Sequence, residues 1–252
     1  MLRVLIILLF LNLNGIVNGQ TNDFKGEKIS FLSLDSLEIT ADLYKIENNK
    51  GPYIILFHQA NFSRGSYRDI APKLNKLGYN CIAVDLRSGH KAQGVINETC
   101  KRAIAVNKKI RFSNAVQDTE AAILYVKDSL KVEKIIVWGS SYSASIAIYL
   151  GSKYSDDIDG ILCFSPGEYF KINDQFIASF SQNIKCPVFI TSGKNEEKKW
   201  NEIYKNISSE KSFFLPKEGG AHGSKALWDE KKGNQVYWVA VKSFLESIRK
   251  DL

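Results

Sequence analysis

The stretch that most constrains the fold is KIIVWGSSYSASIAIYL, residues 134–150. It opens with an apolar run at 135–138, which is typical of a buried strand. It closes with small and apolar residues at 144–150, which are typical of a buried helix. A chain that passes from strand to helix within a few residues must bend sharply, and the bend needs residues of little bulk beside its tip. We therefore expect a tight turn with Ser141 at its tip.

The chain around this stretch alternates between apolar strands and helical segments. Polar and apolar residues alternate at 29–31 and 37–43, which predicts a hairpin whose turn holds Asp35 and Ser36. Continuous apolar runs predict further buried strands at 53–57, 81–84, 158–164, 188–191 and 213–215. Helical patterns separate them, and an amphipathic pattern closes the chain. We predict an α/β fold, with a mainly parallel sheet of about eight strands, helices on both faces and a leading antiparallel hairpin.

Two connections decide how the carboxyl ends of the strands are covered. The segment between Pro166 and Pro187 has room for one short helix, so no large cap domain is expected there. The stretch from Leu86 to Phe112 is longer and shows no strong periodicity, so we expect it to be irregular. Ligand sites in such sheets form at the carboxyl ends of the strands, next to these connections.

The first twenty residues, MLRVLIILLFLNLNGIVNGQ, have the composition of a targeting segment. One early cation, Arg3, precedes an apolar core that is too short to span a bilayer comfortably and ends in small and polar residues. We predict a secretory signal peptide at 1–19 and a single domain at 20–252, which implies a secreted or periplasmic protein without stable membrane insertion after cleavage. The competing interpretation is an uncleaved N-terminal anchor.

Composition bears on cofactors and partners. The chain has four cysteines, none with metal-ligand spacing or an obvious partner, which favours free and mostly buried thiols. The net charge is +7, but the lysines are scattered and form no dense basic run, so nucleic acid is not an expected partner. We expect neither a metal nor an organic cofactor. The sequence leaves the oligomeric state open.

The motif GSSYS at 139–143 resembles the G-x-S-x-G nucleophile elbow of the α/β-hydrolase family, with Ser143 in place of the second glycine. Three further segments, HQA at 58–60, TSGKNEE at 191–197 and GGAHGS at 219–224, follow the order of the family's oxyanion, acid and histidine loops. The resemblance covers nearly all of the chain after residue 20 and is greatest to small dienelactone-hydrolase-type members. It implies Ser141 as nucleophile, His222 as base and Glu196 as acid.

These assignments fit the chemistry. A serine hydroxyl needs a base within hydrogen-bond reach, and the base needs a carboxylate to fix its tautomer. The acid loop also offers Glu197, and Glu168 follows the preceding strand, so three carboxylates remain open. A tetrahedral intermediate needs two preformed donors, which we expect to be the backbone N–H groups of Tyr142 and Ala60.

The resemblance therefore predicts a serine hydrolase that cleaves a carboxylic ester or related acyl bond of a small-molecule substrate. A peptidase or thioesterase would use the same groups. A binding protein with a degenerate site is the alternative from another class, because Gln59, Ser143 and Glu196 depart from the commonest family pattern. Three N-x-S/T sequons stand at Asn61, Asn97 and Asn206.

Overall fold

The computed structural model describes residues 26–249, so the predicted signal peptide at 1–19 lies outside the described residues. Its main sheet has eight strands in the order β1-β2-β4-β3-β7-β8-β9-β10. β2 pairs antiparallel with β1 and with β4, and every other pairing in this sheet is parallel. The predicted sheet and its leading hairpin are thus confirmed. The strands are β1 (Glu27–Leu32), β2 (Glu38–Tyr44), β3 (Tyr53–Phe57), β4 (Asn80–Val84), β7 (Ile135–Ser140), β8 (Gly160–Phe164), β9 (Val188–Thr191) and β10 (Lys211–Phe214).

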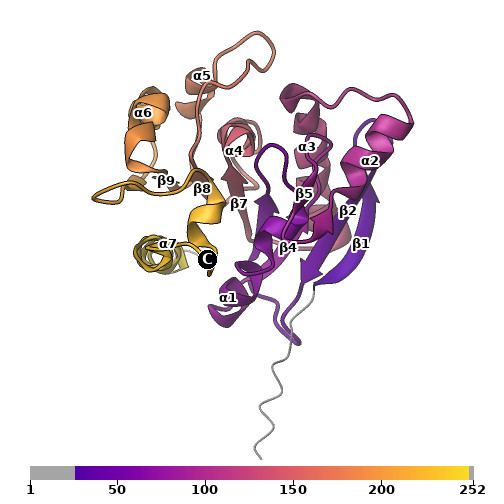
Figure 1. The fold of residues 1–252 in the computed structure, drawn as a ribbon, viewed down its shortest axis with the longest axis horizontal. Coiled ribbons are helices and arrows are strands. Elements are labelled where there is room, and N and C mark those ends of the chain that lie inside the picture. The colour runs from indigo at the N-terminus through magenta and orange to yellow at the C-terminus, as the bar shows by residue number, and fades with distance from the viewer. Residues whose placement is uncertain (1–25, 250–252) are drawn as a thin grey trace, which may run out of the picture.

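Helices cover both faces of this sheet, because its central strands are apolar on both sides (Figure 1). In β3, Ile55 and Phe57 pack with the helices of one face, whereas Ile54 and Leu56 pack with those of the other. The first face carries α3 (Val116–Leu124), α4 (Tyr142–Lys153), α5 (Ile177–Ser181) and α6 (Glu197–Asn206), and the second carries α1 (Ala71–Lys76) and α7 (Asn234–Arg249).

The expectation of an irregular stretch from Leu86 to Phe112 was wrong. This segment contains a two-stranded sheet of β5 (Lys91–Ala92) and β6 (Val95–Ile96), followed by α2 (Glu98–Ala105). The Asn97 side chain caps α2 by accepting a hydrogen bond from the N–H of Cys100 at 2.7 Å. Asn97 is only 1% exposed and its amide is engaged inside the fold, so a glycan on this residue would be incompatible with the observed structure. Cys100, which falls within the stretch expected to be irregular, lies in α2.

A buried ion pair ties the loop after β4 to the rest of this face. The Arg87 guanidinium contacts Asp118 of α3 at 2.7 Å and Asp35 of the hairpin turn at 2.8 Å. Arg87 and Asp118 are fully buried, so each needs the other to offset the loss of hydration. Arg87 thus braces the loop after β4 against the hairpin turn and α3.

The described part of the chain contains neither a disulfide nor a cap domain. All four cysteines are unpaired and buried. Among residues 26–249, no helix has the length and apolar character needed to cross a membrane. The same residues contain no cluster of three or more histidine, cysteine or acidic side chains suited to a metal ion. Between β8 and β9 the chain forms one short helix, α5, and no cap domain.

Candidate active site

The turn between β7 and α4 places Ser141 in a strained conformation at the carboxyl edge of the sheet. Its φ of 60° and ψ of −123° lie outside the ordinary helix and strand regions. Gly139 allows the close approach, because a Cβ there would lie 2.4 Å from the Cα of Ala144. Ser143 is accommodated by polar contacts: its hydroxyl accepts from the N–H of Ser140 at 2.8 Å and lies 2.8 Å from the carbonyl oxygen of Phe57. The serine that replaces the second glycine therefore does not open the turn.

Three predicted side chains form one hydrogen-bonded chain at this edge. Nε2 of His222 lies 2.8 Å from Oγ of Ser141, and Nδ1 of His222 lies 2.5 Å from Oε1 of Glu196. The groups come from three segments: the turn after β7, the loop after β9 and the loop after β10. Ser141 is 8% exposed, and the imidazole is 31% exposed, so the chain of contacts meets solvent at its histidine.

The structure separates the three carboxylates that the sequence left open. Only Glu196, among these three, contacts His222. Glu168 instead caps α5, since its carboxylate accepts from the N–H groups of Ile177 and Ala178 at 2.6 and 2.7 Å. Glu197 is an exposed residue at the start of α6.

Glu196 is held as an anion. Burial alone would raise the pKa of its carboxyl group, but hydrogen bonds from His222, Ser165 and the backbone N–H of Gly193 outweigh burial and keep the pKa below its usual range. The ionised carboxylate fixes the proton on Nδ1 of His222. Nε2 is then free to accept a hydrogen bond from Ser141.

The loop that carries His222 is anchored on its C-terminal side. The N–H of Gly223 donates to Oγ of Ser165 at 2.9 Å, and the N–H of Ser224 donates to Oγ of Ser140 at 2.8 Å. Gly223 has a φ of 71°, and a Cβ there would lie 2.4 Å from Oε1 of Gln59. Gln59 thus lies against the histidine loop, and the glycine at position 223 leaves room for its side chain.

The two predicted backbone donors lie at the ends of neighbouring strands. Tyr142 is the first residue of α4, and Ala60 lies three residues after the end of β3. Within residues 26–249 neither backbone N–H donates to a backbone carbonyl. The side chain of Tyr142 is buried, stacks on Phe112 at 4.4 Å between ring centroids and donates to the carbonyl of Ser88 at 3.1 Å. These contacts fix the start of α4.

His58 has a structural position behind the Ala60 loop. It is fully buried, its Nδ1 lies 2.8 Å from the carbonyl oxygen of Gln59, and its Nε2 accepts from the N–H of Leu86 at 3.0 Å. The Asn97 amide lies 3.1 Å from the same Nε2. Nδ1 therefore carries the single ring proton, and burial lowers the pKa of His58 to about 4.

This buried histidine predicts a specific dependence of stability on pH. Below about pH 6.5 the unfolded chain binds a proton at His58, whereas the folded chain does not. The contribution of His58 to the unfolding free energy is therefore fully present above that pH and falls as the pH drops toward 4. From pH 7 to pH 5 the wild type should lose about 2 kcal/mol more unfolding free energy than His58→Gln. Urea unfolding at both pH values measures this difference. The exposed His90 offers the control, and an equal loss in His58→Gln and His90→Gln would contradict the assignment.

Sequence reasoning missed two residues beside the predicted triad. Ser165 directly follows β8 and contacts Glu196, and Tyr169 lies four residues further on. The Tyr169 hydroxyl donates to the carbonyl of Ser165 at 2.9 Å, and burial is the main cause that raises the pKa of Tyr169. The one sequence feature that could have identified Ser165 is its position directly after an apolar strand.

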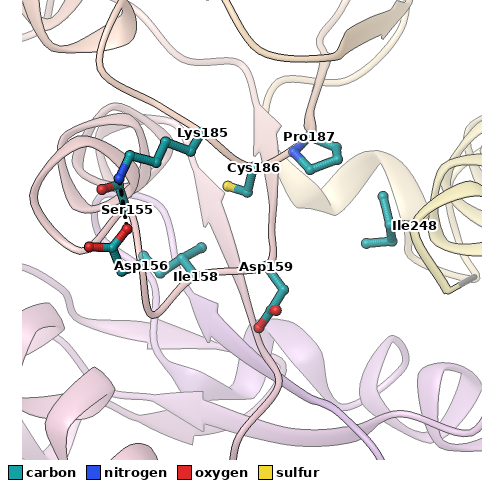
Figure 2. A pocket seen from close by; sticks show the side chains of 8 residues that line it. All are labelled: Ser155, Asp156, Ile158, Asp159, Lys185, Cys186, Pro187 and Ile248. Atoms are coloured by element: carbon teal, nitrogen blue, oxygen red, sulfur yellow. Dashed lines mark hydrogen bonds and ion pairs between the residues drawn. The ribbon is translucent and has the colours of Figure 1, made fainter. Parts of the chain in front are cut away.

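A separate cavity of about 280 Å³ lies away from these groups (Figure 2). It is lined by residues that precede β8 and β9, at the amino ends of the strands, and by Ile248 of α7. Lys185 and Asp156 pair with each other there at 2.7 Å. Because its charges are satisfied internally and it lies at the opposite edge of the sheet from Ser141, this cavity is not part of the candidate site.

The sheet order, the strained turn and the hydrogen-bonded serine, histidine and glutamate are those of an α/β hydrolase. The family model described as "alpha/beta hydrolase fold" matches residues 52–193, and the chain belongs to this family. No curated protein sequence matches the chain significantly.

Solved structures share the fold at low sequence identity. Est1E from Butyrivibrio proteoclasticus, solved with ferulic acid, has a TM-score of 0.69 and 16% identity over 88% of this chain and 99% of its own. A dienelactone hydrolase from Anabaena variabilis has a TM-score of 0.67 and 13% identity over 88% and 98% of the two chains. The Pyrococcus furiosus esterase Pf2001 has a TM-score of 0.66 and 19% identity over 90% and 93%.

Proposed function

We propose that this protein is an exported serine hydrolase that cleaves a carboxylic ester or related acyl bond of a small-molecule substrate through an acyl-enzyme on Ser141. The observation that carries the proposal is the continuous chain of hydrogen bonds from Ser141 through His222 to Glu196. Export rests on the predicted signal peptide at 1–19, which implies a secreted or periplasmic location.

In the proposed first step, Oγ of Ser141 attacks the substrate carbonyl carbon while Nε2 of His222 takes the hydroxyl proton. The carbonyl electron pair moves to oxygen, and the backbone N–H groups of Tyr142 and Ala60 stabilise the resulting oxyanion. When this tetrahedral intermediate collapses, the bond to the alcohol breaks and His222 returns the proton to the departing oxygen. Glu196 stabilises the transient imidazolium throughout.

The second step repeats the first with water as the nucleophile. His222 takes a proton from water, hydroxide attacks the acyl carbon, and the carboxylic acid leaves as the proton returns to Oγ of Ser141. Every group that moves a proton belongs to the chain, so the proposed reaction uses no metal and no organic cofactor.

The substrate class is proposed from the site and from the named neighbours. The connection after β8 contains only one short helix, so extended substrates are not enclosed by a cap. The structural neighbours named above include an esterase, an enzyme solved with ferulic acid and a dienelactone hydrolase, which favours ester or lactone bonds over peptide bonds. A thioester would undergo the same steps at Ser141.

Pre-steady-state hydrolysis of p-nitrophenyl acetate and butyrate by the purified mature chain tests this proposal. An acyl-enzyme that forms faster than it is hydrolysed releases a burst of about one p-nitrophenolate per protein molecule before the steady state. We expect the wild-type protein to turn over both esters and His222→Ala to show no turnover. Release of p-nitrophenolate from both esters at the rate seen in buffer alone would contradict the proposal and favour a binding protein.

A further inference from the structure

Ser165 occupies an unusual position directly after β8. Its φ is 56°, in the left-handed region that favours glycine, and the residue is 1% exposed. Its peptide group continues the sheet, since its N–H donates to the carbonyl of Thr191 at 2.7 Å. Its carbonyl oxygen accepts from the hydroxyl of Tyr169 at 2.9 Å. Hydrogen bonds on both sides therefore hold Ser165 in a backbone conformation that is unfavourable for a residue with a Cβ.

The hydroxyl of Ser165 joins two loops that carry the proposed acid and base. It donates to Oε2 of Glu196 at 2.7 Å and accepts from the N–H of Gly223 at 2.9 Å. The direction of both bonds is determined, because a backbone N–H can only donate and an ionised carboxylate can only accept. One buried hydroxyl thus contacts the acid directly and the backbone of the residue after His222.

The two oxygens of Glu196 are divided between different partners by this arrangement. Oε2 accepts hydrogen bonds from the hydroxyl of Ser165 at 2.7 Å and from the N–H of Gly193 at 3.2 Å. Oε1 accepts a hydrogen bond from Nδ1 of His222. The carboxylate has rotational freedom about its last side-chain bond, which the two donors on Oε2 remove. Oε1 is then presented to the imidazole in a fixed orientation.

We propose that Ser165 is a positioning residue of the triad, which orients the carboxylate of Glu196 toward His222 and anchors the His222 loop through Gly223. This inference rests on the proposed function, since it assigns Ser165 a role in the same reaction. Ser165 acts through Glu196 and His222 and takes no part in bond making at the substrate.

The test compares two variants that remove the hydroxyl in different ways. Ser165→Ala keeps a side chain at a positive φ, whereas Ser165→Gly removes the hydroxyl and also relieves the backbone. Ser181→Ala is the matched control, because Ser181 is fully buried and its hydroxyl has no hydrogen-bond partner within the described residues. Both Ser165 variants should lower kcat by about tenfold to a hundredfold with KM changed less than about threefold. Ser181→Ala should retain the wild-type kcat.

A second measurement does not depend on turnover. The hydrogen-bonded Nδ1 proton of His222 should give a far-downfield proton resonance, assigned by its absence from His222→Ala. This resonance should shift or broaden in both Ser165 variants and stay unchanged in Ser181→Ala. The resonance reports on the orientation of Glu196 against His222, which a role confined to packing would not alter.

The outcomes separate this inference from the proposed function. Wild-type kcat and an unchanged resonance in both Ser165 variants would overturn the inference while leaving the hydrolase proposal intact. Loss of activity in Ser165→Ala but not in Ser165→Gly would also overturn it, because the hydroxyl would then be dispensable. A wild-type protein that hydrolyses no acyl substrate would defeat the proposed function, and the resonance would still decide whether Ser165 orients Glu196.

Discussion

Ser141→Ala should lower kcat/KM for ester hydrolysis by about 10⁴-fold to 10⁶-fold, because no other group can form the acyl-enzyme. In this variant a methyl group replaces the hydroxyl that lies 2.8 Å from Nε2 of His222 in the wild type. Both residues carry a Cβ, so the strained turn at φ 60° is unchanged and stability should stay within about 0.5 kcal/mol. Steady-state kinetics on p-nitrophenyl butyrate, with thermal unfolding of the same samples, measures both effects.

The control for this result is a serine removed elsewhere in the fold. Ser181→Ala deletes a buried hydroxyl of α5 that contacts none of the triad residues and should keep kcat/KM within about twofold of the wild type. If Ser141→Ala retained a tenth or more of the wild-type activity, Ser141 would not be the nucleophile.

Glu196→Gln should lower kcat by about 10³-fold to 10⁴-fold through the tautomer of His222. Ser165 and the N–H of Gly193 both donate to the Oε2 position, so the amide oxygen of glutamine must lie there. The amide NH₂ then faces Nδ1 of His222, which must accept and so carries no proton. Nε2 is protonated in that tautomer and cannot take the proton of Ser141.

Neighbouring carboxylates supply matched controls for this variant. Glu197→Gln changes the adjacent, exposed residue and should leave kcat within about twofold of the wild type. Glu168→Gln weakens the cap of α5 and should lower stability by about 1 kcal/mol with kcat retained. A larger loss of kcat in Glu168→Gln than in Glu196→Gln would show that the acid had been assigned wrongly.

The fold was largely predictable because its central strands are buried on both faces. A run such as YIILF at 53–57 has no polar residue, so its strand is evident from the sequence. The segment 86–112 was not predictable in the same way. β5 and β6 have two residues each, too few to show a strand period. α2 has eight residues, of which Thr99, Cys100 and Ala103 are buried while the apolar Ile104 is exposed, so its apolar pattern does not mark the buried face. Its order depends on contacts with distant residues, such as Asp85 accepting from the N–H of Glu98 at 2.8 Å.

Some residues of the candidate site could be predicted from the sequence, and others could not. Ser141 and His222 were predictable because a tight turn and a glycine-rich loop leave a local signature. The choice of Glu196 over Glu197 needed the structure, since the two adjacent residues differ only in which one faces the histidine loop. Ser165 was signalled only by its position directly after an apolar strand, because its contacts with Glu196 and Gly223 form only when the ends of β8, β9 and β10 come together in the folded sheet.

Covalent labelling by a fluorophosphonate, followed by mass spectrometry of the digested protein, shows whether Ser141 is an activated nucleophile. The reagent reacts preferentially with activated serines, and we expect a single adduct on the peptide that contains Ser141. The adduct should be absent from Ser141→Ala and from His222→Ala, since the serine is inert without its base. An unlabelled wild-type chain, under conditions that label a known serine hydrolase, would contradict the account, as would an adduct on any other serine.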